Sequence, residues 1–408
     1  MPEVPMIRLT EINLQRFKAA FKPGPVELGP FTTIIGRNGS GKSTLIEALQ
    51  WIDTAIRRDA REASDRYRSI ADLVNLRSQA DPNYFQISLK WISEEIEDLE
   101  YIKYAIKVID YDGIPRIALE SLQIKWLGQW AENLIETVDG TRFVKPFSDS
   151  PDMLPFLDTD RLALGRLGDL RQGDPISDSL THFWANAVFL RLAPSRLSEG
   201  SNVTRRSYEP LLDEEGGTLA SLLFEFSAED LFELAESIKG LIPGIQGVER
   251  HRTGKGREAR GEYALLEKMP YRGRAGRTRF EVPSWMLSEG TRRITALLAL
   301  LQRSNPPTLL CVEEVENGLD PWSIRGMLAH LRDASYSTQV VLTTHSPYLL
   351  NDVPMESILL VRRSEGDTRY LKFSDVDEVR EFHDSLPAGT RYVNLENLFW
   401  DDREGSAS

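Results

Sequence analysis

The sequence lacks several features, and each lack excludes a class of protein. It has a single cysteine, Cys311, so no disulfide can form within one chain, which is typical of a reducing compartment. No apolar run approaches the roughly 18 residues that a membrane-spanning helix needs. The first residues, Met-Pro-Glu-Val-Pro, lack the basic and apolar regions of a secretion signal. We therefore expect a cytoplasmic protein with no membrane partner.

Positive charge and histidine are also scarce. The chain has 49 Lys and Arg against 62 Asp and Glu, a net charge of −13, so its surface as a whole repels phosphate. Its five histidines are scattered, which argues against the metal cluster of a nuclease. A hydrophobic content of 41% in 408 residues is typical of a folded protein with two or three domain-sized units.

One glycine-rich stretch has the spacing of a phosphate-binding loop, G-x-x-x-x-G-K-[ST]. It follows a β-type apolar run at 31–35 and precedes a helix-type run at 44–49. Its glycines let backbone N–H groups turn toward an anion, and the helix start adds its positive dipole end. Lys42 would reach the β- and γ-phosphates of ATP, and the Ser43 hydroxyl would hold Mg²⁺. The loop consists of Gly36, Arg37, Asn38, Gly39, Ser40, Gly41, Lys42, Ser43 and Thr44.

The pattern after this loop predicts an antiparallel β lobe. Residues 85–91 and 101–108 alternate apolar and polar side chains, as half-buried strands do. Asp112-Gly113 is a hairpin signal before the next strand. Residues 218–242 then have the apolar spacing of helices.

The α/β pattern returns near the C-terminal end of the chain. Residues 308–312 and 339–343 are short apolar runs, as expected of parallel strands buried on both faces, and 324–334 is helix-like. Open α/β sheets bind ligands at the carboxyl ends of such strands. At the first of these ends we assign Glu313 to Mg²⁺ and Glu314 to the attacking water, although such a pair could also begin a helix.

Two further polar stretches complete the candidate site. His345 follows the second apolar run, where a neutral imidazole could bond the γ-phosphate or the attacking water. Ser288 and Gly290 precede an apolar helix at 294–301, which makes a second anion-binding helix start. Taken alone, this start would pass for an ordinary helix cap. Two such starts in one chain suggest two halves of a composite site.

A basic segment covers residues 250–279. Ten Arg and Lys face three Glu there, a local charge of +7, with glycines interleaved as in loops or hairpin tips. It could contact nucleic acid or an acidic partner, or be a solvated loop, and both readings stay open. The candidate contact residues are Arg272, Arg274, Arg277 and Arg279.

Four motifs in this order resemble those of an ABC-type ATPase: the phosphate loop, Leu-Ser-Glu-Gly, Val-Glu-Glu-x-Glu-Asn-Gly-Leu-Asp-Pro and Thr-Thr-His-Ser-Pro. More narrowly, the chain resembles the RecF/SMC-like and OLD-like AAA-type ATPases of bacterial DNA repair and phage defence. The resemblance covers roughly residues 6–365. It implies an α/β fold, an ABC-type P-loop ATPase core with an antiparallel β lobe and an inserted helical subdomain.

The resemblance also implies roles for single residues. Lys42 and Ser43 bind phosphate and Mg²⁺, Glu313 and Glu314 are the Walker B pair, and His345 is the switch histidine. The signature that completes the partner subunit's site is Leu287, Ser288, Glu289 and Gly290. Asp320 lies in the loop that communicates across the dimer. Arg16 and Lys18 lie in the region that contacts nucleotide.

Some positions depart from the usual ABC pattern. Glu289 replaces the second signature glycine, and Glu313 replaces the Walker B aspartate, as suits the OLD-like branch better than transporters. Gln79 and Gln86 are both candidates for the glutamine loop. The stretch between the phosphate loop and the signature is too short and too β-rich for SMC-type coiled-coil arms.

We therefore expect an ATPase that dimerises around ATP and drives or gates a separate effector in phage defence or DNA processing. About sixty residues follow His345, too few for a fused nuclease domain, so a nuclease or toxin would be another protein. The alternatives are a RecF-like ATP-gated DNA clamp and, less in keeping with the β lobe, a transporter subunit. The expected segments are the P-loop and β lobe at 1–126, the inserted subdomain at 127–280, the rest of the core at 281–365 and an extension at 366–408.

Overall fold

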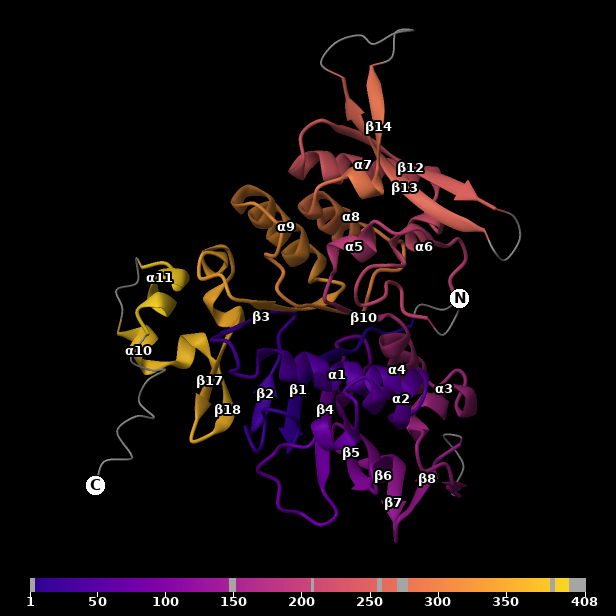
Figure 1. The fold of residues 1–408 in the computed structure, drawn as a ribbon. Helices are drawn as coiled ribbons and strands as arrows, with labels where there is room; N and C mark the ends of the chain where they lie inside the picture. The colour runs from indigo at the N-terminus through magenta and orange to yellow at the C-terminus, as the bar shows by residue number, and fades with distance from the viewer. Residues whose placement is uncertain are drawn as a thin grey trace. The chain divides into compact units, whose positions relative to one another are not determined.

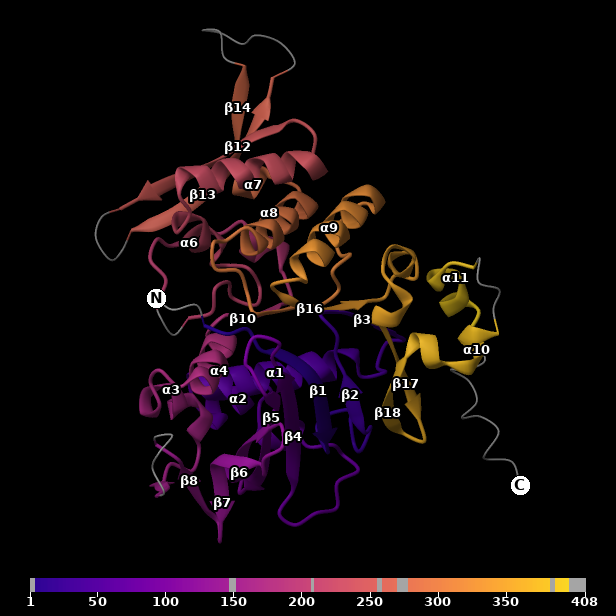
Figure 2. The ribbon, with the colours of Figure 1, turned by 180° about the vertical axis from the view of Figure 1, so that it is seen from behind.

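The computed structural model describes residues 4–146, 152–206, 209–254, 259–269, 278–381 and 386–395. Its contacts group the chain into two compact units (Figures 1 and 2). The first unit is Met1–Ala185 with Pro354–Ser408, and the second is Asn186–Val353. These divisions differ from the four expected segments, because the C-terminal strands return to the unit that contains the phosphate loop. No helix among the described residues is both long and apolar enough to cross a membrane.

The first unit contains an eight-stranded antiparallel sheet, which confirms the predicted β lobe. Its strands in spatial order are β2 (Pro25–Glu27), β1 (Arg8–Gln15), β4 (Tyr84–Ile92), β5 (Leu99–Tyr111), β6 (Ile114–Trp126), β7 (Glu132–Val138), β8 (Thr141–Val144) and β9 (Leu154–Phe156). Asp112 and Gly113 form the predicted β5–β6 turn with positive φ angles of 51° and 78°. The sheet continues beyond residue 126, because β7 pairs with β6, β8 with β7 and β9 with β8, although this stretch lacks a clear strand pattern in the sequence.

Aromatic contacts attach helices to the inward face of this sheet. The inward side chains of β4 alternate with solvent-facing ones, as the sequence predicts. The Phe85 ring meets that of Trp51 on α1 (Lys42–Arg57) edge to face, with ring centroids 5.2 Å apart. Trp91 packs in the same way on Phe183 of α4 (Pro175–Ala185). The helix that follows the phosphate loop is thereby fixed to the sheet.

A second layer of strands in the first unit leads into the phosphate loop. The fully buried β3 (Phe31–Gly36) pairs in parallel with β17 (Ile358–Ser364), which pairs antiparallel with β18 (Asp367–Lys372). The shorter helices of this unit are α2 (Ala60–Asp65), α3 (Leu167–Leu170), α10 (Asp377–Arg380) and α11 (Ala388–Val393).

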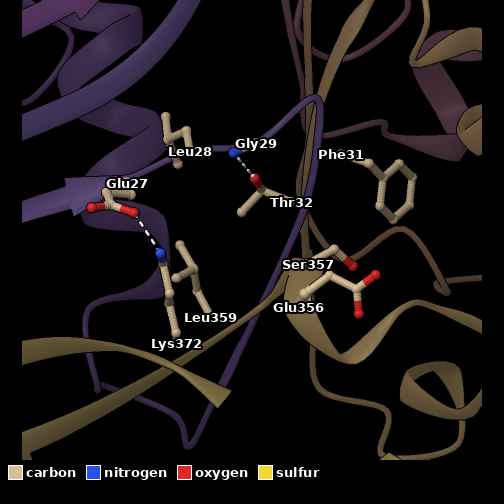
Figure 3. Close-up of a pocket in the computed structure, with 9 residues that line it drawn as sticks. All are labelled: Glu27, Leu28, Gly29, Phe31, Thr32, Glu356, Ser357, Leu359 and Lys372. Atoms are coloured by element: carbon tan, nitrogen blue, oxygen red, sulfur yellow. Dashed lines mark hydrogen bonds and ion pairs between the residues drawn. The ribbon is translucent and has the colours of Figure 1, made fainter. Parts of the chain in front are cut away.

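Figure 3 shows a small hollow beside these strands, with a volume of about 180 Å³. Leu28, Phe31 and Leu359 supply its apolar side chains. At its rim, Lys372 forms an ion pair with Glu27 at 2.5 Å, and this contact raises the pKa of Lys372. At this size the hollow is below the range of nucleotide or drug-sized pockets.

The second unit contains the two parallel strands that the sequence predicts. β10 (Ala187–Leu190), β15 (Leu309–Val312) and β16 (Gln339–Thr344) pair in parallel, and every residue in them is buried. The helices of this unit are α5 (Pro194–Leu197), α6 (Leu219–Phe224), α7 (Ala228–Leu241), α8 (Glu289–Leu301) and α9 (Pro321–Ala334). The predicted helices at 218–242 and 324–334 are confirmed.

The described part of the basic segment is mostly sheet, where loops or hairpin tips were expected. β13 (Arg260–Lys268) pairs with β11 (Ser201–Asn202), β12 (Ile245–Thr253) and β14 (Arg279–Pro283), all antiparallel. Arg250 is structural, because its guanidinium donates to the carbonyl oxygens of Leu223 and Phe226 at 2.9 and 2.8 Å. Arg272, Arg274 and Arg277 lie outside the described residues.

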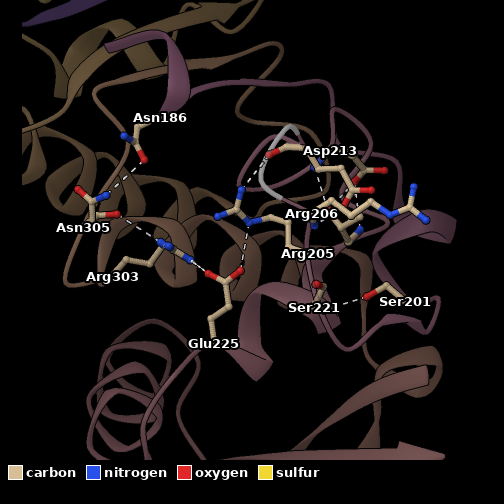
Figure 4. Close-up of polar contacts among 11 residues, drawn as sticks. Asn186, Ser201, Arg205, Arg206, Asp213, Ser221, Glu225, Arg303 and Asn305 are labelled. Carbon is tan, nitrogen blue, oxygen red and sulfur yellow. Dashed lines mark hydrogen bonds and ion pairs between the residues drawn. The ribbon is translucent and has the colours of Figure 1, made fainter. Parts of the chain in front are cut away.

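A polar network in the second unit connects Glu225, just after α6, with Arg303, just after the end of α8 (Figure 4). The Glu225 carboxylate accepts from Arg303 at 2.7 Å and from Arg205 at 3.1 Å. Partial burial acts to raise the pKa of Glu225, but the two guanidinium groups outweigh it and hold that pKa below its usual value. Each charge in the network therefore has a partner within the unit.

The first unit also encloses a buried ion pair. The Glu120 carboxylate, fully buried on β6, accepts from Arg142 at 2.7 Å and from the Tyr104 hydroxyl at 3.0 Å. Backbone N–H groups of Ala163 and Leu164 also donate to it, each at 2.9 Å. Burial and the nearby carboxylate raise the pKa of Tyr104. A buried carboxylate with this many donors ties the 163–164 segment to the sheet.

Removing the cation from this pair should destabilise the first unit. We expect Arg142→Met to lower the free energy of unfolding by about 3–5 kcal/mol, because Glu120 is left buried without its counter-charge. Arg166→Met is the control, since Arg166 pairs with Asp169 on the surface, and its loss should cost less than about 1 kcal/mol. Urea denaturation followed by tryptophan fluorescence measures both, and equal losses would contradict a structural role for the buried pair.

Candidate functional site

The phosphate loop lies between β3 and α1, as the sequence predicts. Gly39 and Gly41 have φ angles of +74° and +103°, which side-chain-bearing residues rarely adopt. A Cβ atom at Gly41 would lie 2.6 Å from the Thr368 hydroxyl, and one at Gly36 would lie 2.2 Å from the Val361 carbonyl oxygen. The loop therefore requires glycine at Gly36 and Gly41 for space and at Gly39 for conformation.

The polar groups of the loop fit an anion. Lys42 is 7% exposed, and its ammonium donates to the carbonyl oxygens of Gly36 and Arg37 at 2.8 and 3.1 Å. The hydroxyl of Ser40 is buried and has no hydrogen-bond partner among the described residues. No side chain caps the start of α1, and its first turn has no acidic residue. A phosphate would satisfy a helix start of this kind.

Residues of β18 hold this loop from behind, and the sequence analysis missed them. The Thr368 hydroxyl, fully buried, lies 3.0 Å from the Ser40 carbonyl oxygen and 3.1 Å from that of Ala19, so it can donate to either. The Tyr370 hydroxyl donates to the Gly41 carbonyl oxygen at 2.9 Å. Both side chains thus hold backbone carbonyl groups of the phosphate loop in place.

The same strand fixes the neighbouring loop. The Asp367 carboxylate accepts from the backbone N–H groups of Phe21 and Lys22 at 2.7 and 2.9 Å. The hairpin that leads into β18 turns at Glu365 and Gly366, which both have positive φ angles, and the sequence analysis did not identify it. No local pattern could have shown that its far strand contacts residues more than 300 positions away.

Arg16 and Lys18 have protein partners in the structure. The Lys18 ammonium pairs with Glu47 of α1 at 2.5 Å. The Arg16 guanidinium lies over the Tyr84 ring, 4.3 Å from its centroid, and donates to Ser78 at 3.1 Å. Their contact with nucleotide stays a prediction.

In the second unit, polar side chains gather where β15 and β16 end. Glu314 has a positive φ of 49°, an unfavourable conformation for a residue with a side chain. Its N–H donates to the Thr343 hydroxyl at 3.0 Å, and its carboxylate accepts from Asn317 at 2.5 Å. Its other carboxylate oxygen lies 3.8 Å from Nε2 of His345. The structure therefore brings together the two residues that were predicted separately as water-activating and switch groups.

Glu316 positions the histidine and was not singled out from the sequence. Its carboxylate accepts from the backbone N–H of His345 at 2.7 Å, while its other oxygen is buried without a hydrogen-bond partner among the described residues. Glu316 and Asn317 both lie within the Val-Glu-Glu-x-Glu-Asn motif, but the motif alone assigned neither residue a role. The backbone of Glu313 donates to Leu190 at 2.8 Å, and its assignment to Mg²⁺ stays a prediction.

The predicted signature begins α8. The Ser288 hydroxyl accepts from the Thr291 N–H at 3.1 Å, which makes Ser288 the N-cap, and Leu287 before it is buried. Glu289 pairs with Arg293 at 3.2 Å on the same helix. Ser288 therefore has a helix-capping role within the chain, and its contact with a partner's nucleotide stays a prediction.

The signature packs against the loop that follows Glu314. A Cβ atom at Gly290 would lie 2.4 Å from the Gly318 carbonyl oxygen, so only glycine fits this approach. Asp320 caps α9 by accepting from the N–H groups of Trp322 and Ser323, both at 3.0 Å. Hydrogen bonds from Ser323, above all from its hydroxyl, hold the pKa of Asp320 below its usual value. The communication role of Asp320 is likewise untested.

Two further predictions concern metal and basic residues. Among the described side chains no cluster of three or more His, Cys, Asp or Glu residues is arranged to hold a metal ion. The assignment of Mg²⁺ to Ser43 and Glu313 stays a prediction. Of the four candidate contact arginines, the structure describes Arg279, which begins β14 and is exposed.

The hydrogen bond from Thr368 of β18 to the phosphate loop should strengthen nucleotide binding. We expect Thr368→Val to weaken ATP affinity about 5- to 30-fold, because a lost hydrogen bond to a buried carbonyl costs about 1–2 kcal/mol. Thr368→Ser keeps the hydroxyl and should bind ATP like the unchanged protein. Calorimetric titration with ATP measures both, and equal affinities for the Val and Ser variants would contradict a positioning role.

Two family models match the sequence. Residues 169–351 match "AAA domain, putative AbiEii toxin, Type IV TA system", and residues 11–150 match "AAA domain". No curated protein sequence matches the chain. The two matched ranges lie on either side of residues 151–168, so the AAA-type similarity extends over most of the chain in two pieces.

Solved structures show which fold these pieces form. The structure of an SMC head bound to the C-winged helix domain of ScpA matches with a TM-score of 0.54 and 16% identity, over 89% of this chain and 97% of that one. The head with an extended coiled coil bound to the C-terminal domain of ScpA, from Pyrococcus furiosus, gives 0.53 and 14%, over 92% and 99%. The head from Pyrococcus yayanosii gives 0.51 and 12%, over 92% and 100%. The chain therefore combines AAA-type domain matches with the ABC-type P-loop fold of SMC heads.

Proposed function

We propose that this protein is a cytoplasmic ATPase that dimerises around ATP and drives or gates a separate partner protein. The observation that carries the proposal is the conformation of Glu314. The Glu314 backbone is strained, and Asn317 holds its carboxylate beside His345 at a strand end, which supports a catalytic role for this side chain. The phosphate loop in the same chain would bind the nucleotide on which this carboxylate acts.

The proposed reaction is the hydrolysis of ATP to ADP and phosphate. The loop N–H groups and Lys42 bind the triphosphate, and Ser43 and Glu313 hold Mg²⁺, which neutralises phosphate charge when bound. Glu314 accepts a hydrogen bond from the attacking water and takes its proton as the water oxygen bonds the γ-phosphorus and the bond to the bridging oxygen breaks, which releases ADP. His345 donates to the phosphate from a position fixed by Glu316. Catalysis of this kind depends on positioning and charge stabilisation.

Exposed apolar side chains support dimerisation through the signature. Trp285 and Met286 directly precede it and are 58% and 70% exposed, and Trp322, just after Asp320, is 82% exposed. Large apolar side chains exposed beside polar functional residues are typical of protein interfaces. In the proposed dimer each copy offers Ser288 to the nucleotide of the other copy.

The partner is proposed to be an effector protein with its own activity, such as a nuclease or a toxin. One matching family model is described as "AAA domain, putative AbiEii toxin, Type IV TA system", which supports a role in defence. Two of the similar SMC heads were solved with ScpA domains bound, so this fold can dock a second protein.

Replacing the proposed base should separate binding from turnover. We expect Glu314→Gln to bind ATP as before while hydrolysis falls by about 10²–10⁴-fold, because the amide cannot accept the proton. Dimers should accumulate with ATP, as light scattering after size-exclusion chromatography would show. Lys42→Ala, the control, should lose ATP binding and remain monomeric. Phosphate release by Glu314→Gln at the unchanged rate would reject the assignment.

A further inference from the structure

The loop that follows β15 fixes three of the four polar groups of Glu314. Its N–H donates to the Thr343 hydroxyl at 3.0 Å, and its carbonyl oxygen accepts from the Asn317 N–H at 3.0 Å. One carboxylate oxygen, Oε2, accepts from the side-chain amide of Asn317 at 2.5 Å. Asn317 therefore contacts Glu314 twice, once through its backbone and once through its side chain.

The fourth polar group, the carboxylate oxygen Oε1, is open to solvent and to the histidine. It accepts no hydrogen bond within the part of the chain that the structure describes, and it lies 3.8 Å from Nε2 of His345. The Glu314 side chain is 41% exposed, so water can reach it. A carboxylate with one oxygen held and the other free presents a single proton acceptor in a fixed direction.

The strained backbone of Glu314 requires this support. Its φ of 49° lies in the left-handed region, which a residue with a side chain keeps only where its surroundings hold it there. Among the described residues of the second unit, Glu314 is the only one other than glycine with a positive φ. The bonds from Asn317 and to Thr343 therefore maintain the strain at the residue proposed as the base.

Backbone conformation and helix capping do not account for the Asn317 side chain. Asparagine is favoured where φ is positive, but the positive φ here belongs to the next residue, Gly318, at 71°. The helix that follows is capped by Asp320. Asn317 is exposed, and its amide makes one hydrogen bond among the described residues, the bond to Glu314.

We infer that Asn317 is a positioning residue for ATP hydrolysis, which fixes Oε2 of Glu314 so that Oε1 accepts the proton of the attacking water. The inference rests on the proposed function, in which Glu314 is the base. As the water oxygen bonds the γ-phosphorus, its proton passes to Oε1, and the bond to the bridging oxygen breaks with its electron pair leaving on ADP. Asn317 acts in this step only through Glu314.

Steady-state ATPase assays on Asn317 variants of the full chain test the inference. We expect Asn317→Ala to lower kcat about 10- to 100-fold and to leave KM for ATP unchanged, because the carboxylate is no longer held in its productive position. Asn317→Gln keeps an amide that can donate, so its kcat should exceed that of Asn317→Ala about threefold or more. Asn317→Ala should still form dimers with ATP, because nucleotide binding is intact.

An asparagine in the first unit provides a matched control. The Asn133 amide likewise donates to a carboxylate three residues away, that of Glu136, at 2.9 Å. Asn133→Ala removes the same kind of bond from the β lobe and should leave kcat unchanged. The unfolding temperature of each variant, compared with that of the unchanged protein, shows whether a loss of kcat comes from a damaged fold.

Combining two changes shows whether Asn317 acts through Glu314. The base is already absent in Glu314→Gln, so adding Asn317→Ala should not lower the residual rate further, as radiolabelled ATP would show. A residue that supported the fold or nucleotide binding would lower that rate by the same factor as it does in the unchanged protein.

Three results would overturn the inference. One is an unchanged kcat for Asn317→Ala, and another is a rise in KM large enough to account for its loss of activity. The third is an equal loss from Asn317→Ala with and without the Glu314 carboxylate. Failure of the ATPase proposal looks different, because Glu314→Gln alone would then hydrolyse ATP at the unchanged rate, which would overturn both.

Discussion

The conformation of Gly41 is the constraint on which the rest of the first unit depends. Its φ of +103° turns the chain from β3 into α1, so that the helix start faces the phosphate site. No side chain larger than hydrogen fits there, because the Thr368 hydroxyl occupies the space. The same hydroxyl lies within hydrogen-bond distance of the Ser40 carbonyl oxygen, 328 residues away in sequence. The anion-binding geometry thus relies on a strand from near the C-terminal end of the chain.

The second unit relies on a comparable close approach. Gly290 of the signature packs on the carbonyl oxygen of Gly318, four residues after the strained Glu314. Asp320, in the same loop, begins α9. The signature, the loop and the strand ends are therefore parts of one packed arrangement.

Local patterns were sufficient for the features that are local. The phosphate loop, the hairpin at Asp112 and the buried strands β15 and β16 each have a signal within a few residues, and the structure confirms their positions. The four motifs together predicted the ABC-type fold, which the similarity to SMC heads confirms.

Features that depend on pairing over long distances could not be predicted. The contacts of β18 with the phosphate loop join residues 328 positions apart, and no local pattern in either segment encodes them. The extent of the β lobe through β9 was missed because those strands are short. Glu316 and Asn317 were within a motif, but only their contacts with His345 and Glu314 show what they do.

The central claim is that each ATP lies between two copies of the chain, and mixing two inactive variants tests it directly. Ser288→Asp should keep the α8 cap, because Asp is as good an N-cap as Ser, while its charge repels the partner's triphosphate. Ser288→Asn, the control, keeps the cap without the charge. Lys42→Ala removes the binding lysine.

Ser288→Asp and Lys42→Ala should each be inactive alone, whereas a mixed dimer contains one site with both residues intact. Equal mixing should therefore restore up to about half of the ATPase rate, since neither variant forms a dimer around ATP alone and each mixed dimer has one good site of two. A mixture as inactive as its components, or a Ser288→Asp variant with the full rate, would contradict the account.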